Sequence, residues 1–110
     1  MRDKKRTKKP LPKEIAKIVD QIKRRYKPEK IILYGSYAQG KQTRDSDIDM
    51  LIIKKTKKRF IERISDVLLL CDYDIPIEPI VYTPQEVAAR IKLGDFFIVD
   101  IIRKGKVIYG

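Results

Sequence analysis

Histidine is absent from this sequence of 110 residues, and cysteine occurs only once, at position 71. The lack of histidine removes the commonest general base and metal ligand together, which excludes Ser–His–Asp hydrolases, histidine-dependent nucleases and zinc hydrolases. One cysteine cannot form an internal disulfide and supplies too few thiolates for a zinc site. Cys71 ends an apolar run and is expected to be a small core residue. Any catalysis must therefore use carboxylates, lysines, or metal ions held by oxygen ligands.

Long apolar runs are also absent. No stretch approaches the ~20 residues needed to span a bilayer, and the charged N-terminus lacks the apolar stretch of a signal peptide. These absences predict a soluble, cytoplasmic protein without a membrane partner.

Basic residues are abundant and partly concentrated at the start of the chain. The formal net charge is +11, and residues 1–10 hold six Lys or Arg against one Asp. We expect residues 1–12 to form a basic, disordered arm and residues 13–110 to form one domain. A second basic cluster, residues 54–59, follows the acidic motif described below. Such charge can attract nucleic acid, but no RNA-recognition aromatic motif accompanies it, so charge alone gives this partner little support.

Apolar spacing predicts alternating strands and helices over the rest of the chain. Helices are expected over 13–26, 60–71, from 84 onward and over 96–103, and strands over 31–34, 47–53, 75–82 and 106–109. The prolines at 76 and 79 place the third strand at a sheet edge, because proline cannot donate a ladder hydrogen bond. The sequence thus predicts an α/β (α+β) fold, a small mixed sheet covered by helices.

The stretch LYGSYAQGKQ, residues 33–42, has the glycine and lysine spacing of a Walker phosphate-binding loop. A Walker loop continues into a helix whose first turn carries a magnesium-binding Ser or Thr. Here Gln42 occupies that position, and a predicted strand soon follows. The Walker interpretation is therefore rejected.

Paired carboxylates provide a better interpretation. Asp47 and Asp49 are two residues apart at the start of a strand, so their side chains share one face while Ile48 points into the core. Adjacent anions of this kind suit a hard divalent cation, and Mg²⁺ binds a couple of carboxylates together with substrate phosphates. Glu78, on the third strand, is the expected third carboxylate. Each feature alone also fits an ordinary loop or surface position; together they predict a metal site.

Two segments, Gly35-Ser36-Tyr37-Ala38-Gln39-Gly40 and Ser46-Asp47-Ile48-Asp49-Met50-Leu51-Ile52, resemble the motif of the DNA polymerase beta-like nucleotidyltransferase superfamily. The small size and the end of the chain resemble the minimal nucleotidyltransferases, or MNT proteins, of MNT/HEPN toxin–antitoxin modules. Two positions depart from the family pattern: Gln39 stands where arginine is common, and Glu78 stands where aspartate is usual.

The resemblance implies a role for each motif. Gly35 and Ser36 would hold the phosphates of ATP, with Lys41 and Arg44 as cationic helpers. Asp47, Asp49 and Glu78 would bind two Mg²⁺ or Mn²⁺ ions and carry the catalysis. The expected reaction moves AMP from ATP onto a tyrosine of a HEPN-type toxin, with this chain as the antitoxin.

Two alternatives of other kinds stay open at this stage. One is a small-molecule nucleotidyltransferase, although the aminoglycoside-modifying members carry helical lobes that this chain lacks. The other is a non-catalytic antitoxin or binding module that inhibits its partner by contact. The sequence does not specify the base, the acceptor or the oligomeric state, so a homo-oligomer also stays open.

Overall fold

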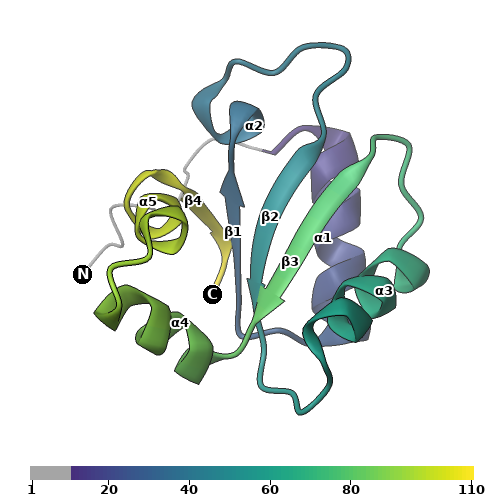
Figure 1. Cartoon of the computed structure of the whole chain (residues 1–110). Coiled ribbons are helices and arrows are strands. Elements are labelled where there is room, and N and C mark those ends of the chain that lie inside the picture. Colours follow the sequence, from purple (N-terminus) through teal and green to yellow (C-terminus); the bar gives the residue numbers. More distant parts are fainter. Residues whose placement is uncertain (1–10) are drawn as a thin grey trace.

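The computed structural model describes residues 11–110, and residues 1–10, most of the predicted basic arm, lie outside the described part. Strands and helices alternate around one four-stranded sheet (Figure 1). In chain order the elements are α1 (Lys13–Tyr26), β1 (Lys30–Tyr34), α2 (Ser36–Gln39), β2 (Ile48–Ile53), α3 (Phe60–Leu70), β3 (Ile77–Tyr82), α4 (Pro84–Lys92), α5 (Phe96–Lys104) and β4 (Lys106–Tyr109). The predicted fold class is confirmed.

The sheet is mixed, with strand order β3-β2-β1-β4. β1 runs antiparallel to both β2 and β4, whereas β2 and β3 are parallel. The prediction that the proline-containing strand lies at an edge is confirmed, because β3 pairs only with β2. Parallel pairing brings the first residues of β2 and β3 to the same end of the sheet.

Two apolar clusters cover the two faces of the sheet. The larger one joins α1 and α3 to alternate strand residues such as Ile31, Met50 and Ile52. The smaller one joins α5 to the opposite face and includes Ile32, Leu51 and Ile101. α4 packs against α5, and both helices lie to one side of β2 and β3 (Figure 1). The α5 face is therefore less completely covered over β2 and β3.

Local sequence signals explain several element boundaries. The start of α4 is a capping box, in which the Thr83 hydroxyl accepts from the Glu86 amide at 3.1 Å and the Glu86 carboxylate accepts from the Thr83 amide at 2.8 Å. Pro84 occupies the first turn, where its missing N–H costs little. Asp95 caps α5 by accepting from the Phe97 and Ile98 amides.

The apolar spacing of residues 60–71 predicts one apolar face for α3, formed by Phe60, Ile61, Ile64, Val67, Leu68 and Cys71, and this prediction is partly wrong. Phe60 and Ile61 are exposed, whereas Arg63 is 6% exposed. The Arg63 guanidinium donates to the Val81 carbonyl at 3.0 Å and to the Glu86 carboxylate at 2.6 Å, so its charge and its donors are satisfied inside the protein. Cys71 follows α3 and is buried in the larger cluster, as expected, and burial raises its thiol pKa to about 11. No helix within residues 11–110 has the length and apolar character to cross a membrane.

Candidate active site

The three predicted carboxylates come together at one end of the sheet. Asp49 and Glu78 are directly opposite each other in the parallel register of β2 and β3. Asp47 immediately precedes β2, where the Ile48 amide donates to the Pro76 carbonyl at 2.9 Å and so ties the start of β2 to the start of β3. The sequence predicts that the three carboxylates form one site, and the register of the parallel β2–β3 pair is what brings Asp49 beside Glu78.

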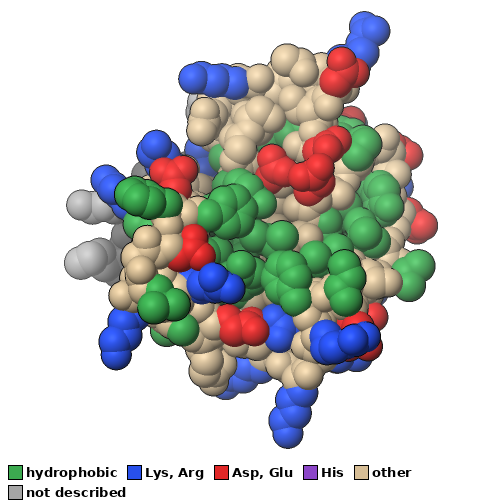
Figure 2. All heavy atoms as spheres, viewed as in Figure 1, with side chains coloured by type: hydrophobic (Ala, Val, Ile, Leu, Met, Phe, Trp, Pro, Cys, Tyr) green, Lys and Arg blue, Asp and Glu red, His purple; other side chains and the backbone are tan. Residues whose placement is uncertain are grey.

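These carboxylates belong to the α5 face of the sheet. Side chains alternate along a strand, so Asp49 shares a face with Leu51, which is in the smaller cluster. Glu78 likewise shares a face with Ile80 and Tyr82 of the same cluster. Ile48 is fully buried on the opposite face, as predicted. Figure 2 shows acidic side chains gathered beside an apolar surface, and both are open to solvent in this view.

A tight glycine turn lies directly against the carboxylates. β1 ends at Tyr34, which is paired with Asp49, and Gly35 then turns the chain into α2 with φ +74°. A Cβ built on Gly35 would lie 2.4 Å from Asp49 Oδ2, far inside van der Waals contact. Only glycine allows both the left-handed backbone and this close approach. The turn that the sequence predicts to hold phosphates therefore adjoins the predicted metal ligands.

The electrostatics of the cluster are those of crowded anions. Burial raises the pKa of Asp49, and the charge of Asp47 adds to this, although a hydrogen bond with Glu78 acts in the opposite direction. A hydrogen bond with Asp47 and the negative charge of Asp49 raise the pKa of Glu78. Burial, with the charges of Asp49 and Glu78, raises the pKa of Tyr34 to about 12, so its hydroxyl stays protonated at neutral pH. The site thus favours cations and hydrogen-bond donors.

Oxygen ligands at this position fit a magnesium or manganese ion. Within residues 11–110, no three Asp, Glu or Cys side chains form a ready-made metal-binding group. Mg²⁺, however, usually takes one or two carboxylates and completes its shell with water and substrate phosphates. Asp47 and Asp49 could supply that pair, and a divalent cation would offset the burial and the Asp47 charge that together raise the pKa of Asp49.

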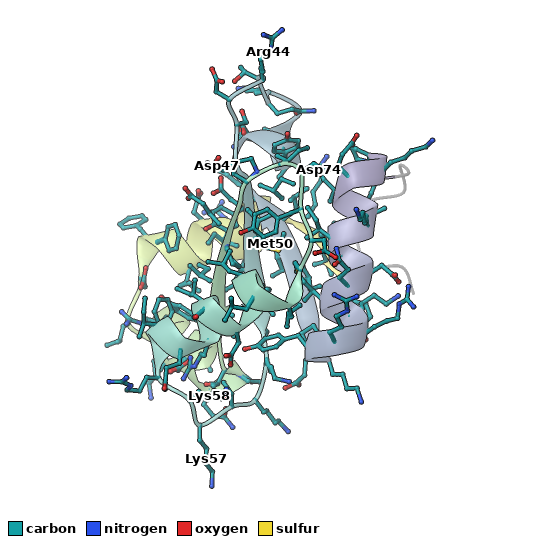
Figure 3. The ribbon with its side chains drawn as sticks, turned by 90° about the vertical axis from the view of Figure 1, so that its right-hand side faces the viewer. Arg44, Asp47, Met50, Lys57, Lys58 and Asp74 are labelled. Carbon is teal, nitrogen blue, oxygen red and sulfur yellow. The ribbon has the colours of Figure 1, made fainter. Side chains whose placement is uncertain are left out.

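The two predicted cationic helpers, Lys41 and Arg44, both lie in the loop between α2 and β2. Lys41 is exposed and lies two residues after the end of α2. Arg44 lies at the tip of that loop, and its side chain points away from Asp47 (Figure 3). Ser36, the first residue of α2, directly follows the Gly35 turn.

The second basic cluster does not reach the site. Lys54 follows the last residue of β2, whereas Asp49 is near the first. The two are five positions apart along the strand, about 17 Å. Lys54 instead donates to the Tyr26 carbonyl and lies 4.6 Å from the centre of the Tyr26 ring. Lys57 and Lys58 lie at the same far end of the sheet (Figure 3).

Comparison with known proteins places this chain in a family. Residues 16–110 match the model of the family "Polymerase beta, Nucleotidyltransferase". A relative from Methanocaldococcus jannaschii, named a "putative protein adenylyltransferase", is 33% identical over 99 residues, which are 88% of this chain and 96% of the relative. A second protein of that organism, with the same description, is 38% identical over 72% of this chain and 56% of its own length.

A solved structure is also similar to this chain. It is the crystal structure of a "putative nucleotidyltransferase" from Sulfolobus solfataricus, with a TM-score of 0.45 and 19% identity over 76% of this chain and 85% of that one. The family match and the first relative each extend over most of the described residues. The chain therefore belongs to the polymerase beta nucleotidyltransferase family and is a nucleotidyltransferase.

Proposed function

We propose that this nucleotidyltransferase moves AMP from ATP onto a hydroxyl of a partner protein. The observation that carries the proposal is the convergence of Asp47, Asp49 and Glu78 beside the Gly35 turn. Carboxylates next to a tight backbone turn suit the transfer of a phosphate group with the help of divalent ions. The names of the Methanocaldococcus jannaschii relatives support a protein as the acceptor.

Each residue of the site has a role in this proposal. Asp47 and Asp49 hold two magnesium or manganese ions, and Ser36 donates its hydroxyl to an outer phosphate of ATP. Lys41 and Arg44, in the adjacent loop, add positive charge where the triphosphate enters. When bound, the metal ions offset the charge that develops on the attacking and leaving oxygens.

Glu78 lies nearest the acceptor and takes the proton from its hydroxyl. The hydroxyl oxygen bonds to the α-phosphorus, the bond from that phosphorus to the bridging oxygen breaks, and pyrophosphate leaves. The raised pKa of Glu78 suits a proton acceptor, because a more basic carboxylate accepts the proton more readily.

We further propose that the acceptor is a tyrosine of a HEPN-type toxin and that this chain is its antitoxin. The resemblance of residues 35–40 and 46–52 to the minimal nucleotidyltransferases supports this. A tyrosine hydroxyl has an ordinary pKa of ~10, so a carboxylate and a nearby positive charge would both assist its attack.

The test is a transfer assay with the product of the neighbouring gene. The full chain is incubated with α-labelled ATP, Mg²⁺ or Mn²⁺ and that partner, and the modified residue is located by mass spectrometry. We expect one AMP on a tyrosine of the partner. A partner that binds tightly but gains no nucleotide with any triphosphate or metal would overturn the transfer reaction and leave inhibition by contact.

Matched variants connect the reaction to the site. Asp49→Asn removes one charge from the cluster, and Asp45→Asn removes the same charge from an exposed position of the adjoining loop. We expect the first variant to lose transfer and the second to keep it. Equal activity of the two variants would contradict the assignment of the carboxylates.

A further inference from the structure

A cavity of about 130 Å³ lies between α2 and α5, on the side of the Gly35 turn that faces away from β3. We call it the α2–α5 cavity. Its apolar walls are Tyr34, Ala38, Phe97 and Ile101. The cavity is open at its outer side, where Phe97 is half exposed. Tyr34 and Ala38 lie in the stretch that the sequence singles out, but Phe97 and Ile101 do not, because the cavity exists only once α5 packs on the sheet.

The size and walls of this cavity suit a flat aromatic ring. Cavities of roughly 150 Å³ lined by apolar side chains can hold a benzene ring. Tyr34 and Phe97 meet edge to face, with ring centres 5.8 Å apart and planes at 89°, so the face of one ring remains available to a ligand.

The polar groups of the cavity suit a neutral ligand with several hydrogen-bonding atoms. Gln39 lines one side, and its amide can both donate and accept. Asp100 and Lys104 form an ion pair with N–O distance 3.2 Å at the exposed edge. The pair has no net charge, so it does not favour a phosphate over a neutral group. Its carboxylate can accept from an amine, and its ammonium can donate to a ring nitrogen.

The position of the cavity links it to the carboxylates. Gly35 forms part of the cavity wall and also lies against Asp49. Only Gly35 separates the carboxylates from the cavity. A nucleotide whose α-phosphate is at the carboxylates would therefore have its base within reach of the cavity.

We propose that the α2–α5 cavity binds the base of the nucleoside triphosphate, with the ring against Tyr34 and Phe97 and its exocyclic amine at Asp100 or Gln39. An amine-bearing purine, adenine, meets these requirements. This inference rests on the proposed function, because it takes the carboxylates to be the site of transfer.

The experiment uses the absence of tryptophan from the chain. Phe97→Trp places a single indole in the cavity wall, and Phe96→Trp places one on the adjacent residue, which is 89% exposed and does not line the cavity. Each full-length variant is titrated with MgATP and with magnesium tripolyphosphate, which has the phosphates but no base. We expect ATP to quench the fluorescence of Phe97→Trp, and we expect little change with tripolyphosphate or in Phe96→Trp.

Calorimetry on Phe97→Ala and Phe96→Ala gives a second readout. Loss of a stacking partner should weaken ATP binding roughly tenfold in Phe97→Ala, leave tripolyphosphate binding unchanged, and have no effect in Phe96→Ala. Phe97→Leu keeps apolar volume without the π face and serves if Phe97→Ala does not fold. Equal responses to ATP and tripolyphosphate in every variant would overturn the cavity as a base site. Quenching by the acceptor protein but not by ATP would also overturn it.

The same measurements separate this inference from the proposed function. AMP transfer that is intact in Phe97→Ala, with unchanged ATP affinity, would reject the base site and keep the reaction. AMP transfer by Asp49→Asn at the wild-type rate would reject the proposed reaction. Quenching of Phe97→Trp by ATP would then still show that the base binds in the cavity.

Discussion

Gly35 lies so close to Asp49 that any larger residue at position 35 would occupy the space of the Asp49 carboxylate. The ideal Cβ position is 2.4 Å from Asp49 Oδ2 and 3.3 Å from its Cγ, and the Gly35 φ of +74° is itself unfavourable for other residues. The backbone turn and the carboxylate are therefore in direct contact. A phosphate bound by the turn would lie beside the carboxylate.

Gly35→Ala tests this unit, and Gly40→Ala is its matched control. Gly40 has nearly the same φ, +70°, but nothing lies within 4 Å of its Cβ position. Gly40→Ala should lose about 1–2 kcal/mol of unfolding free energy, because Gly40 is in the left-handed αL region. Gly35→Ala should lose more, because the ψ of −153° at Gly35 puts it in a region that only glycine adopts readily. Only Gly35→Ala also displaces Asp49, and we expect it to lower AMP transfer by about 100-fold or more. Urea unfolding and transfer assays of both variants measure the two effects, and similar transfer rates would contradict the argument.

Metal binding should stabilise the folded protein through Asp47 and Asp49. We expect the melting temperature to rise with Mg²⁺ or Mn²⁺, and to rise further with a triphosphate present, because a ligand that binds only the folded state stabilises it by mass action. The double variant Asp47→Ala plus Asp49→Ala should lose this rise, whereas Asp45→Asn should keep it. Calorimetric titration gives the same comparison, and identical heats from wild type and the double variant would exclude a shared metal site.

Glu78→Gln should separate binding from chemistry. The amide is nearly the same shape as the carboxylate but cannot take a proton, so ATP binding should persist while transfer is lost. The raised pKa of Glu78 also has a consequence for stability. A raised carboxyl pKa means that the charged form is disfavoured in the folded state, so at neutral pH the metal-free variant should melt at a higher temperature than wild type.

This stability difference should shrink as the pH falls, because protonation of Glu78 in the wild type removes the same negative charge. Thermal unfolding in a chelator from pH 7 down to pH 4 measures it. A variant that melts below wild type at pH 7 would show that Glu78 is not repelled by its neighbours. Full transfer activity in Glu78→Gln would exclude it as the proton acceptor.

The periodic parts of the fold could be predicted from the sequence. The helix at 13–26 shows a regular apolar stripe, and the start of α4 carries Thr83, Pro84 and Glu86 in capping positions, so local rules alone determine both. The edge position of β3 follows from its prolines. These predictions succeeded because each depends on residues close together in the chain.

The errors arose where distant residues decide the outcome. Arg63 is buried because Val81 and Glu86 supply its partners, and no local pattern shows this. Lys54 follows the paired aspartates closely in sequence, yet β2 places it at the far end of the sheet. The proposed roles of Asp47, Asp49 and Glu78 stay predictions, although the register now explains how Asp49 and Glu78 meet.

Arg63 and Glu86 provide a test of stability away from the active site. The Arg63 side chain is 7% exposed, and Glu86, although 44% exposed, accepts from it at 2.6 and 3.2 Å. Arg63→Ala leaves the buried Val81 carbonyl without this donor, whereas the half-exposed Glu86 carboxylate can be solvated, so the variant should lose about 1–3 kcal/mol of unfolding free energy. Arg24→Ala breaks an exposed pair with Asp20 and should cost less than about 1 kcal/mol.

The pH dependence of this pair has a definite sign. The hydrogen bond from Arg63 lowers the pKa of Glu86 in the folded protein. Its stabilising effect should therefore be present above the ordinary glutamate pKa of about 4.3 and be lost as the pH falls through the lower folded value. Urea unfolding at pH 7 and near pH 3 should show that wild type loses more stability than Arg63→Ala over this range.

The double variant Arg63→Ala plus Glu86→Gln should be less destabilised than the sum of the single variants, since both partners of the pair are then gone. Strict additivity, or a cost of Arg63→Ala no greater than that of Arg24→Ala, would show that the buried arginine does not stabilise the junction of α3, β3 and α4.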